Sequence, residues 1–384
     1  MRAYGRTNLN LYAVLLIILD IAIFGAISFK RKQKNVWIIF LILVVVAIFL
    51  GGNSANPDYA TYQYTYLHGR VHKIEIIYTL LIDIGNYLGF SFQVFRLELY
   101  CIALLLLYIA VSRVEKKTTF FWVLYIVFPM MLDGTQTRNF LAMVIVLNAV
   151  AFLVDRNKGN IIKFCVLIAF ATGFQALSLL FILLLLIPYV ENSKILRRII
   201  ITVIVFSIIL ALNRSALSSV INSISLLYGD VDSRITKYGV IQTRYGFLLS
   251  WMIHMIIFGL SAYIRKKIHA EEGRDENRVK LIEFAYWLSI ISFLYFPFYV
   301  LVSTFDRIYR TVLVFEYALW TAALQNSDVS IHGKKFVIRL DYALISIAII
   351  AFSIGLFTAN INSLYHETIV QTFFHDNWIL QQLF

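Results

Sequence analysis

Long apolar runs constrain this chain more than any other feature. They recur from end to end of its 384 residues, of which 60% are hydrophobic and only 15% are charged. An α-helix of 18 or more apolar residues can cross the roughly 30 Å hydrocarbon layer of a bilayer. Helices are favoured because strand-like alternation is absent and because a helix pairs its own backbone groups in lipid. The sequence therefore predicts an all-α, polytopic transmembrane bundle.

Twelve segments have the composition of such spans. They are residues 9–29, 36–50, 92–112, 118–133, 136–154, 161–175, 176–190, 196–212, 246–264, 280–302, 306–324 and 337–358. The first segment lacks a small-residue cleavage pattern and precedes many others, so we expect it to be retained and not removed as a signal peptide. The sequence shows no internal repeat and no soluble module. Residues 1–384 are therefore predicted to form one integral membrane domain.

The positions of the basic residues predict an orientation. Of the 34 lysines and arginines, 22 fall in six connections that would share one side of the membrane. These are residues 30–34, 113–117, 155–163, 191–198, 265–280 and the connection holding Lys334, Lys335 and Arg339. The positive-inside rule makes this side cytoplasmic, which accounts for the net charge of +12 without a nucleic-acid partner. The outer side then carries loops 51–91 and 213–245 and the tail 359–384.

This orientation requires that residues 74–88 do not cross the membrane. Four polar residues of this segment fall on one stripe of a helix, and most of its other positions are apolar. The polar ones are Glu75, Thr79, Asp83 and Asn86. A helix of this kind lies in the membrane interface with its polar stripe facing water. We therefore expect an amphipathic interfacial helix here.

Cysteine usage and short motifs narrow the chemistry. The two cysteines, Cys101 and Cys165, each lie inside an expected span and suggest neither a disulfide framework nor a metal cluster. The sequence contains no glycine-rich phosphate loop and no nucleophile elbow. We expect no metal and no cofactor.

Arginines at the outer ends of spans are the candidate functional residues. Arg138, Arg244 and Arg307 each precede or begin an expected helix, and Arg310 follows one turn later. A helix N-terminus favours an anion, and guanidinium pairs with phosphate through two parallel hydrogen bonds. Together these residues predict a site for a phosphorylated lipid headgroup. Two simpler interpretations stay open: the side chains anchor to ordinary headgroups, or Arg310 pairs with Asp306 in its own helix.

The first outer loop offers complementary groups. Tyr59 and Tyr62 surround Asp58, and tyrosine rings stack on sugars while a carboxylate accepts a hydroxyl proton. Beside Arg138 stand Gln136 and Asn139, two further hydrogen-bonding side chains in an otherwise apolar stretch. The alternatives are an aromatic belt at the interface and a turn role for Asp58.

At these residues the chain resembles the EpsG family within the Wzy-type polysaccharide polymerases. "DYATY" matches an Asp-Tyr-x-x-Tyr pattern, "QTRNFLA" places Arg138 at a motif arginine, and "DRIYR" supplies Arg307, Tyr309 and Arg310. In "GFQALSLLF", Gln175 stands where that family has a histidine, which leaves Asp58 as the better candidate for a base. The resemblance covers roughly residues 10–325.

The resemblance implies a fold similar to the GT-C class of membrane glycosyltransferases and a polymerase of undecaprenyl-pyrophosphate-linked repeat units. It would act without metal, with inversion, at the outer face of the bacterial cytoplasmic membrane. Asp58 and Arg138 would be catalytic, and Arg138, Arg244, Arg307 and Arg310 would bind pyrophosphate. Substrate contacts would come from Tyr59, Tyr62, Gln136, Asn139, Gln175, Tyr245 and Tyr309. Expected partners are the lipid-linked donor and acceptor, membrane lipids, a chain-length regulator and a flippase, but no nucleic acid.

Three other functions are compatible with parts of the pattern. A flippase for lipid-linked oligosaccharide would bind the same headgroup, but such transporters often show symmetry between halves. A glycosyltransferase of the O-antigen-ligase or arabinosyl type would share the donor and differ in acceptor. A membrane acyltransferase would need a catalytic histidine in a span, and His254, the only candidate, has no supporting motif.

Overall fold

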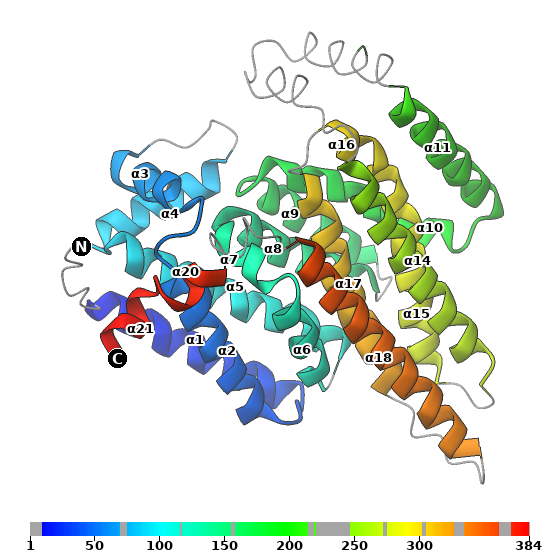
Figure 1. Ribbon diagram of the computed structural model, residues 1–384, viewed down its shortest axis with the longest axis horizontal. Helices are drawn as coiled ribbons and strands as arrows, with labels where there is room; N and C mark the ends of the chain where they lie inside the picture. The colour runs from blue at the N-terminus through cyan, green and yellow to red at the C-terminus, as the bar shows by residue number, and fades with distance from the viewer. Residues whose placement is uncertain are drawn as a thin grey trace. The chain divides into compact units, whose positions relative to one another are not determined.

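The computed structural model describes residues 10–69, 75–115, 117–154, 158–213, 219, 246–271, 275–301, 305–325, 334–360 and 370–383. Across these residues the secondary structure is helical, apart from one isolated antiparallel bridge between Asn53 and Asn377. Figure 1 shows the described helices in the order of the sequence, and the chain divides into two compact units. The first comprises Met1–Ile182 with Tyr317–Phe384, and the second comprises Leu183–Glu316. The predicted all-α class is confirmed.

The first unit holds most of the N-terminal helices and the C-terminal ones. They are α1 (Leu11–Lys30), α2 (Val36–Gly52), α3 (Tyr59–His68), α4 (Ile76–Tyr87), α5 (Phe92–Val114), α6 (Thr119–Val127), α7 (Met130–Thr135), α8 (Thr137–Val154), α9 (Lys158–Thr172), α18 (Lys334–Asn360), α20 (Gln371–Phe374) and α21 (Trp378–Leu383). The predicted outer loop 51–91 is thus largely two helices, α3 and α4.

The second unit is built from helices of the middle of the chain. They are α10 (Ile187–Val190), α11 (Lys194–Leu212), α14 (Phe247–His269), α15 (Glu276–Ile291), η2 (Ser292–Tyr295) and α16 (Phe296–Leu301). Two elements cross a unit boundary, η1 (Ala176–Leu186) and α17 (Asp306–Gln325). Of the predicted outer loop 213–245, all but Asn213 and Ser219 lie outside the described residues.

Seven described stretches are long and apolar enough to span a membrane. They are Leu11–Lys30, Phe92–Val114, Thr137–Val154, Lys194–Leu212, Phe247–His269, Glu276–Leu301 and Asp341–Ala359. The other five expected spans also appear as helices, but they are shorter, interrupted or more polar. Residues 118–133, for example, break at Pro129, because a residue before proline disfavours helical backbone and Phe128 is extended. Length and composition thus support seven of the twelve expected spans.

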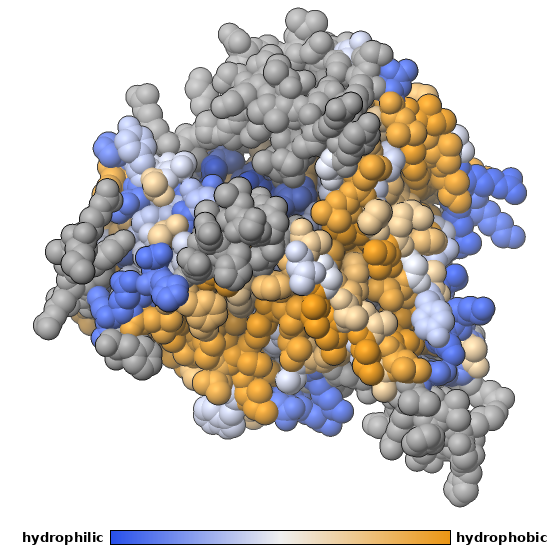
Figure 2. Space-filling model, viewed as in Figure 1, coloured by the Kyte–Doolittle hydropathy of each residue, from blue (hydrophilic) through white to orange (hydrophobic). Residues whose placement is uncertain are grey.

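Burial separates the central helices from those that face lipid. α8 is buried over 89% of its apolar window and α5 over 78%, whereas α1 and α11 are buried over only 17%. A helix that is apolar all round and buried on all sides belongs to the interior of a bundle. The exposed apolar side chains of helices such as α1 and α11 suit a hydrocarbon surrounding, and Figure 2 shows broad orange patches of apolar side chains on the visible face.

Capping side chains fix where the first helices begin. Asn10 caps α1 by accepting a hydrogen bond from the Ala13 N–H at 3.0 Å, and its amide donates to the Leu88 carbonyl at 2.9 Å. Ser91 caps α5 through the Val94 N–H at 3.3 Å. Such caps satisfy backbone donors that a helix leaves unpaired in its first turn. The Asn10 side chain also ties the start of α1 to the residue that follows α4.

The C-terminal helices pack into the first unit. The Ser54 N–H donates to the Asp376 carbonyl at 2.7 Å, and the Asn377 amide donates to the Ile48 carbonyl at 2.9 Å. A Cβ on Gly134 would lie 2.5 Å from the Phe373 ring, so any larger residue there would have to displace that ring. The segment predicted as an outer tail, 359–384, therefore includes helices α20 and α21 that cover the ends of α2 and α7.

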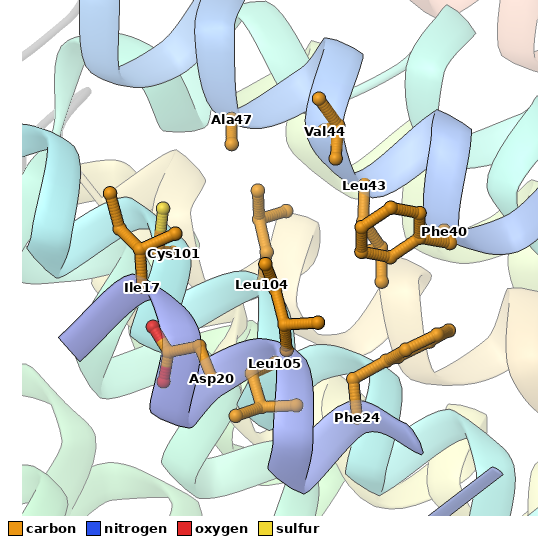
Figure 3. A pocket seen from close by; sticks show the side chains of 11 residues that line it. Ile17, Asp20, Phe24, Phe40, Leu43, Val44, Ala47, Cys101, Leu104 and Leu105 are labelled. Atoms are coloured by element: carbon orange, nitrogen blue, oxygen red, sulfur yellow. The ribbon is translucent and has the colours of Figure 1, made fainter. Parts of the chain in front are cut away.

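A cavity of about 110 Å³ lies between α1, α2 and α5 (Figure 3). Its lining is apolar except for Asp20 and Cys101. Glu98, one turn before Cys101, is 2% exposed, and neither of its carboxylate oxygens has a hydrogen-bond partner among the described residues. Asp20 faces other helices, and this region of the membrane domain holds two carboxyl groups without a cationic partner in the described part of the chain.

Candidate functional site

An ion pair between Arg138 and Glu75 forms the centre of the candidate site. Arg138 is the second residue of α8, and Glu75 stands immediately before α4. The guanidinium Nη1 donates to the Glu75 Oε2. The Arg138 side chain is 21% exposed, and that of Glu75 is 3% exposed. The pair therefore joins the first turn of a central helix to the start of the expected interfacial helix, with the arginine on the accessible side.

Two tyrosine rings flank the guanidinium. The Arg138 Cζ lies 5.5 Å from the ring centroid of Tyr62 in α3 and 5.7 Å from that of Tyr78 in α4. These distances are within the range of cation–π attraction, and the two rings meet edge to face at 6.2 Å. Burial raises the pKa of the Tyr78 phenol, so this side chain stays neutral at physiological pH. We call Arg138, Glu75, Tyr62 and Tyr78 the Arg138 cluster.

The turn after α9 positions α4. The N–H groups of Ile77 and Tyr78 both point at the Gly173 carbonyl, at 3.1 and 3.4 Å. A Cβ on Gly173 would lie 2.5 Å from the Ile77 side chain, so the absence of a side chain permits this close approach. Gln175 follows two residues later, and its Oε1 is buried without a partner among the described residues. The "TGFQA" turn is thus attached to the start of α4, next to the Arg138 cluster.

Gln136 and Asn139 flank Arg138 in the sequence. Gln136 links α7 to α8, its N–H donating to the Asp133 carbonyl at 3.1 Å and its carbonyl accepting from Phe140 at 2.9 Å. Asn139 is 6% exposed, and its Nδ2 donates to none of the described residues. The first turn of α8 therefore has a buried amide with unused donor capacity directly beside Arg138.

Asp58 and Tyr59 lie at the start of α3. Asp58 is half-buried, its N–H donates to the Asn56 Oδ1 at 3.1 Å, and its carbonyl accepts from the Tyr62 N–H at 3.0 Å. Asp58 is thus one helical turn from Tyr62, whose ring covers Arg138. Tyr59 contacts a different arginine: its ring centroid lies 5.5 Å from the Arg96 Cζ.

Arg96, in α5, is surrounded by backbone carbonyls. It is 2% exposed and donates to the Asn53 carbonyl and, at 2.7 Å, to the Gly134 carbonyl. Tyr100 adds hydrogen bonds from its hydroxyl to the same Gly134 carbonyl at 2.8 Å and to the Asp133 carbonyl at 3.1 Å. We call Arg96, Tyr100, Asn53 and Gly134 the Arg96 network. It binds the end of α2 to α7, the short helix that precedes α8.

The remaining arginine candidates belong to the second unit or are outside the described residues. Arg307 and Arg310 lie in the first turns of α17, as predicted, and Tyr309 between them is 2% exposed. Arg310 is fully buried and lies 3.8 Å from the Asp306 carboxylate, which is the intrahelical pairing considered from the sequence. Arg307 is half-buried, and its Nε has no partner among the described residues. Arg244 and Tyr245 lie outside the described residues.

His254 in α14 is part of a saturated network in the second unit. Its Nε2 lies 2.7 Å from the Tyr299 hydroxyl and its Nδ1 lies 2.9 Å from the Ser292 Oγ. The imidazole is fully buried, and both ring nitrogens are engaged. This arrangement is that of a packed structural histidine.

Two members of the Arg138 cluster, Glu75 and Tyr78, were not among the predicted site residues. Glu75 was expected on a stripe facing water, and this was wrong: the residue is 2% exposed and paired with Arg138. Tyr78 was not singled out. A usable signal existed, because an arginine in an apolar stretch favours a nearby anion and Glu75 is the acidic residue just before the predicted interfacial helix.

The apolar helices and the buried, arginine-centred cluster define an integral membrane protein of the all-α class. The chain belongs to the EpsG family, whose model matches residues 36–370. That match includes all members of the Arg138 cluster, and membership implies a role in exopolysaccharide biosynthesis. The family expected from "DYATY" and "QTRNFLA" is confirmed. Comparison with curated proteins and with solved structures gives no match.

Proposed function

We propose that the protein polymerises oligosaccharide repeat units carried on undecaprenyl pyrophosphate, at the outer face of the bacterial cytoplasmic membrane. The observation that carries the proposal is the Arg138 cluster: a guanidinium at the start of a central helix, flanked by two tyrosine rings and partly exposed. Family membership supplies the polysaccharide context. A helix N-terminus and a guanidinium both favour phosphate, and the tyrosine rings suit the apolar faces of sugars.

The chemistry requires charge stabilisation more than acid catalysis, because pyrophosphate is already a good leaving group. In the proposed step an acceptor hydroxyl oxygen bonds to the anomeric carbon of the donor sugar, and the bond from that carbon to the pyrophosphate oxygen breaks. Asp58 takes the hydroxyl proton, and the lipid pyrophosphate leaves with the electron pair, held by Arg138. Attack opposite the leaving group inverts the anomeric centre. A preorganised cation for the departing charge is the largest contribution expected of the protein.

Other side chains complete the proposed substrate contacts. Gln136, Asn139 and Gln175 offer amide groups around Arg138, and Tyr59 and Tyr62 offer rings and hydroxyls in the first outer segment. Arg244, Arg307 and Arg310 are further candidates for the two pyrophosphates of donor and acceptor, with Tyr245 and Tyr309 beside them. The unused donor of Asn139 supports a polar ligand at this end of α8.

We also propose how the two units are arranged in the membrane and which molecules the protein works with. Both compact units belong to one membrane domain of twelve spans, similar to the GT-C class, with the basic connections in the cytoplasm and the Arg138 cluster outside. The lipid-linked donor and acceptor enter from the membrane. A flippase supplies repeat units to the outer face, and a chain-length regulator sets when the polymer is released.

Replacement of Arg138 by Ala and by Lys tests the function. Membrane levels of both variants are measured first, and lipid-linked glycans and surface polysaccharide are then separated by size. Single repeat units at the outer face in place of long chains are the expected result. The exposed Arg198 in α11 provides a matched control, because R198A removes an arginine that belongs to the other unit and is not a member of the cluster.

The other outcomes point to the alternatives. Long chains made by R138A would contradict the polymerase proposal for this site and leave Arg138 as a headgroup anchor. Repeat units trapped on the cytoplasmic face would favour a flippase. Chains that are long but are no longer transferred to a final acceptor would favour an enzyme of the O-antigen-ligase type.

A further inference from the structure

The Arg138 guanidinium already holds an anion. Glu75 occupies its Nη1, while its Nε is buried and has no partner among the described residues. A guanidinium has five N–H donors in a planar fork and can bind a carboxylate or a phosphate through two of them at once. In the observed pair, a carboxylate of the protein therefore occupies a guanidinium donor that could also bind a phosphate oxygen.

The ion pair is not needed to hold α4 in place. Gly173 accepts from the N–H groups of both Ile77 and Tyr78, and the Thr79 hydroxyl donates to the Glu75 carbonyl at 3.2 Å. The Glu75 side chain makes no capping hydrogen bond to α4. The backbone of this turn is thus fixed by contacts that do not involve Arg138, so loss of the ion pair leaves the start of the helix in place.

We propose that Glu75 is the resting counter-ion of Arg138 and that the pyrophosphate of the donor displaces it. Donor binding is then an exchange of one anion for another on a single guanidinium, and Glu75 is a positioning residue that acts through Arg138. This inference rests on the proposed function. The exchange is required because a buried carboxylate and a pyrophosphate repel each other when both approach one cation.

The exchange keeps the empty site compact and assists release of the product. Without Glu75, an empty Arg138 would lie largely buried and unpaired, which is unfavourable. With Glu75, the lipid pyrophosphate that remains after transfer meets a competing anion and leaves sooner. Removal of the carboxylate therefore strengthens pyrophosphate binding and slows turnover, so KM and kcat fall together.

Direct binding measurements test the exchange. Full-length protein in detergent is titrated calorimetrically with farnesyl pyrophosphate and with inorganic pyrophosphate. E75Q preserves the size of the side chain and removes its charge, and we expect it to bind both probes about tenfold or more tightly than wild type. E75D retains the charge and should stay near wild type, and R138A should lose binding. If E75Q binds both probes equally or less tightly than wild type, the exchange is wrong.

A matched control removes the acidic member of another ion pair. Glu283 accepts from the Arg265 Nε at 2.7 Å, and E283Q should leave the affinity for pyrophosphate unchanged. An equal gain in affinity in E283Q would show a general effect of net charge and would also overturn the exchange. Wild type and R138A binding equally, or neither binding, contradicts the proposed function itself. Loss of binding in R138A without a gain in E75Q contradicts the exchange alone.

Discussion

Arg96 and Arg138 are two buried arginines of the same unit with opposite surroundings. Arg96 is 2% exposed and donates to two backbone carbonyls, which can neither move away nor change charge. Arg138 is paired with a side-chain carboxylate, is 21% exposed, and has a donor without a partner among the described residues. The first arrangement fixes backbone, whereas the second can exchange its anion. Identity of the partner, more than burial, distinguishes an arginine that builds the fold from one that can bind a substrate.

The largest effect is expected at the Arg96 network. R96A leaves the Asn53 carbonyl without this donor, while the Gly134 carbonyl still accepts from the Tyr100 hydroxyl. An unsatisfied buried acceptor costs about 1–3 kcal/mol, and the loss of a fully buried side chain adds the cost of a cavity. We therefore expect a loss of more than about 1–3 kcal/mol in unfolding free energy and low membrane levels. Unfolding in detergent measures this loss, with R198A as the unaffected control. An R96A protein as stable as wild type would remove the contrast between the two arginines.

Neutralising the Arg138 cluster should affect function and spare the fold. In E75L/R138M both charged side chains of the pair are replaced by apolar side chains of similar volume, and such replacement of a buried pair is often neutral for stability. Chain formation should fall about 10²–10³-fold, the loss typical of removing one stabilising donor for a developing negative charge. Unfolding in detergent and polymer length are measured on the same preparation. Parallel loss of stability and chains would mean that the pair is structural, like Arg96.

A methyl group at Gly173 should disturb the cluster from a distance. The new Cβ of G173A would lie 2.5 Å from the Ile77 side chain, so that side chain must repack, and any shift of the start of α4 would move Glu75 and Tyr78 as well. Overpacking of this kind costs about 1–3 kcal/mol. We expect reduced polymerisation and a smaller loss of stability than in R96A.

Gly25 provides the control for this change. It lies in α1, and a Cβ added there would meet no atom within 4 Å, so G25A should be silent or slightly stabilising. Polymer yield and unfolding are compared for the two variants. Equal behaviour of G173A and G25A would show that the contact between Gly173 and Ile77 does not position the cluster.

The smallest effect is expected at the Tyr62 ring. Y62L removes a cation–π contact worth about 0.5–2 kcal/mol, which corresponds to about a 2- to 30-fold loss of kcat/KM. Y62F retains the ring and should lose less. Tyr64 is 65% exposed and stacks on His68, so Y64L is the control. A Y62F variant as impaired as Y62L would assign the contribution of Tyr62 to its hydroxyl.

The helices could be predicted from the sequence because hydrophobic runs and their interruptions are local. The two short helices meeting near "TGFQA" were expected between residues 161 and 190, and α9 indeed ends at Thr172 before η1 begins at Ala176. The break at Pro129 was not expected, although proline gives a local reason for it. Membrane spanning of the shorter helices stays a prediction, since length and composition support seven spans.

The candidate site could be predicted only in part, because its contacts connect distant segments. The polar stretch from Asp133 to Asn139 is continuous in the sequence, yet the structure divides it. The carbonyls of Asp133 and Gly134 accept hydrogen bonds from Tyr100 and Arg96 in α5. The Arg138 side chain instead contacts α3 and α4. Periodicity placed Glu75 on a polar stripe, but a charged partner 63 positions away determines where its side chain lies.

The contacts of the C-terminal helices have a consequence for the order of assembly. The Asn53 amide donates to the Thr372 hydroxyl across 319 positions of sequence, and Asn53 is also a member of the Arg96 network. Synthesis proceeds from the N-terminus. The end of α2 therefore lacks the hydrogen bond from Asn53 to Thr372 until nearly the whole chain has been made. Packing at the end of α2, next to Arg96, is therefore completed only after residues 372–377 have been synthesised. A chain that ends before them lacks these hydrogen-bond partners.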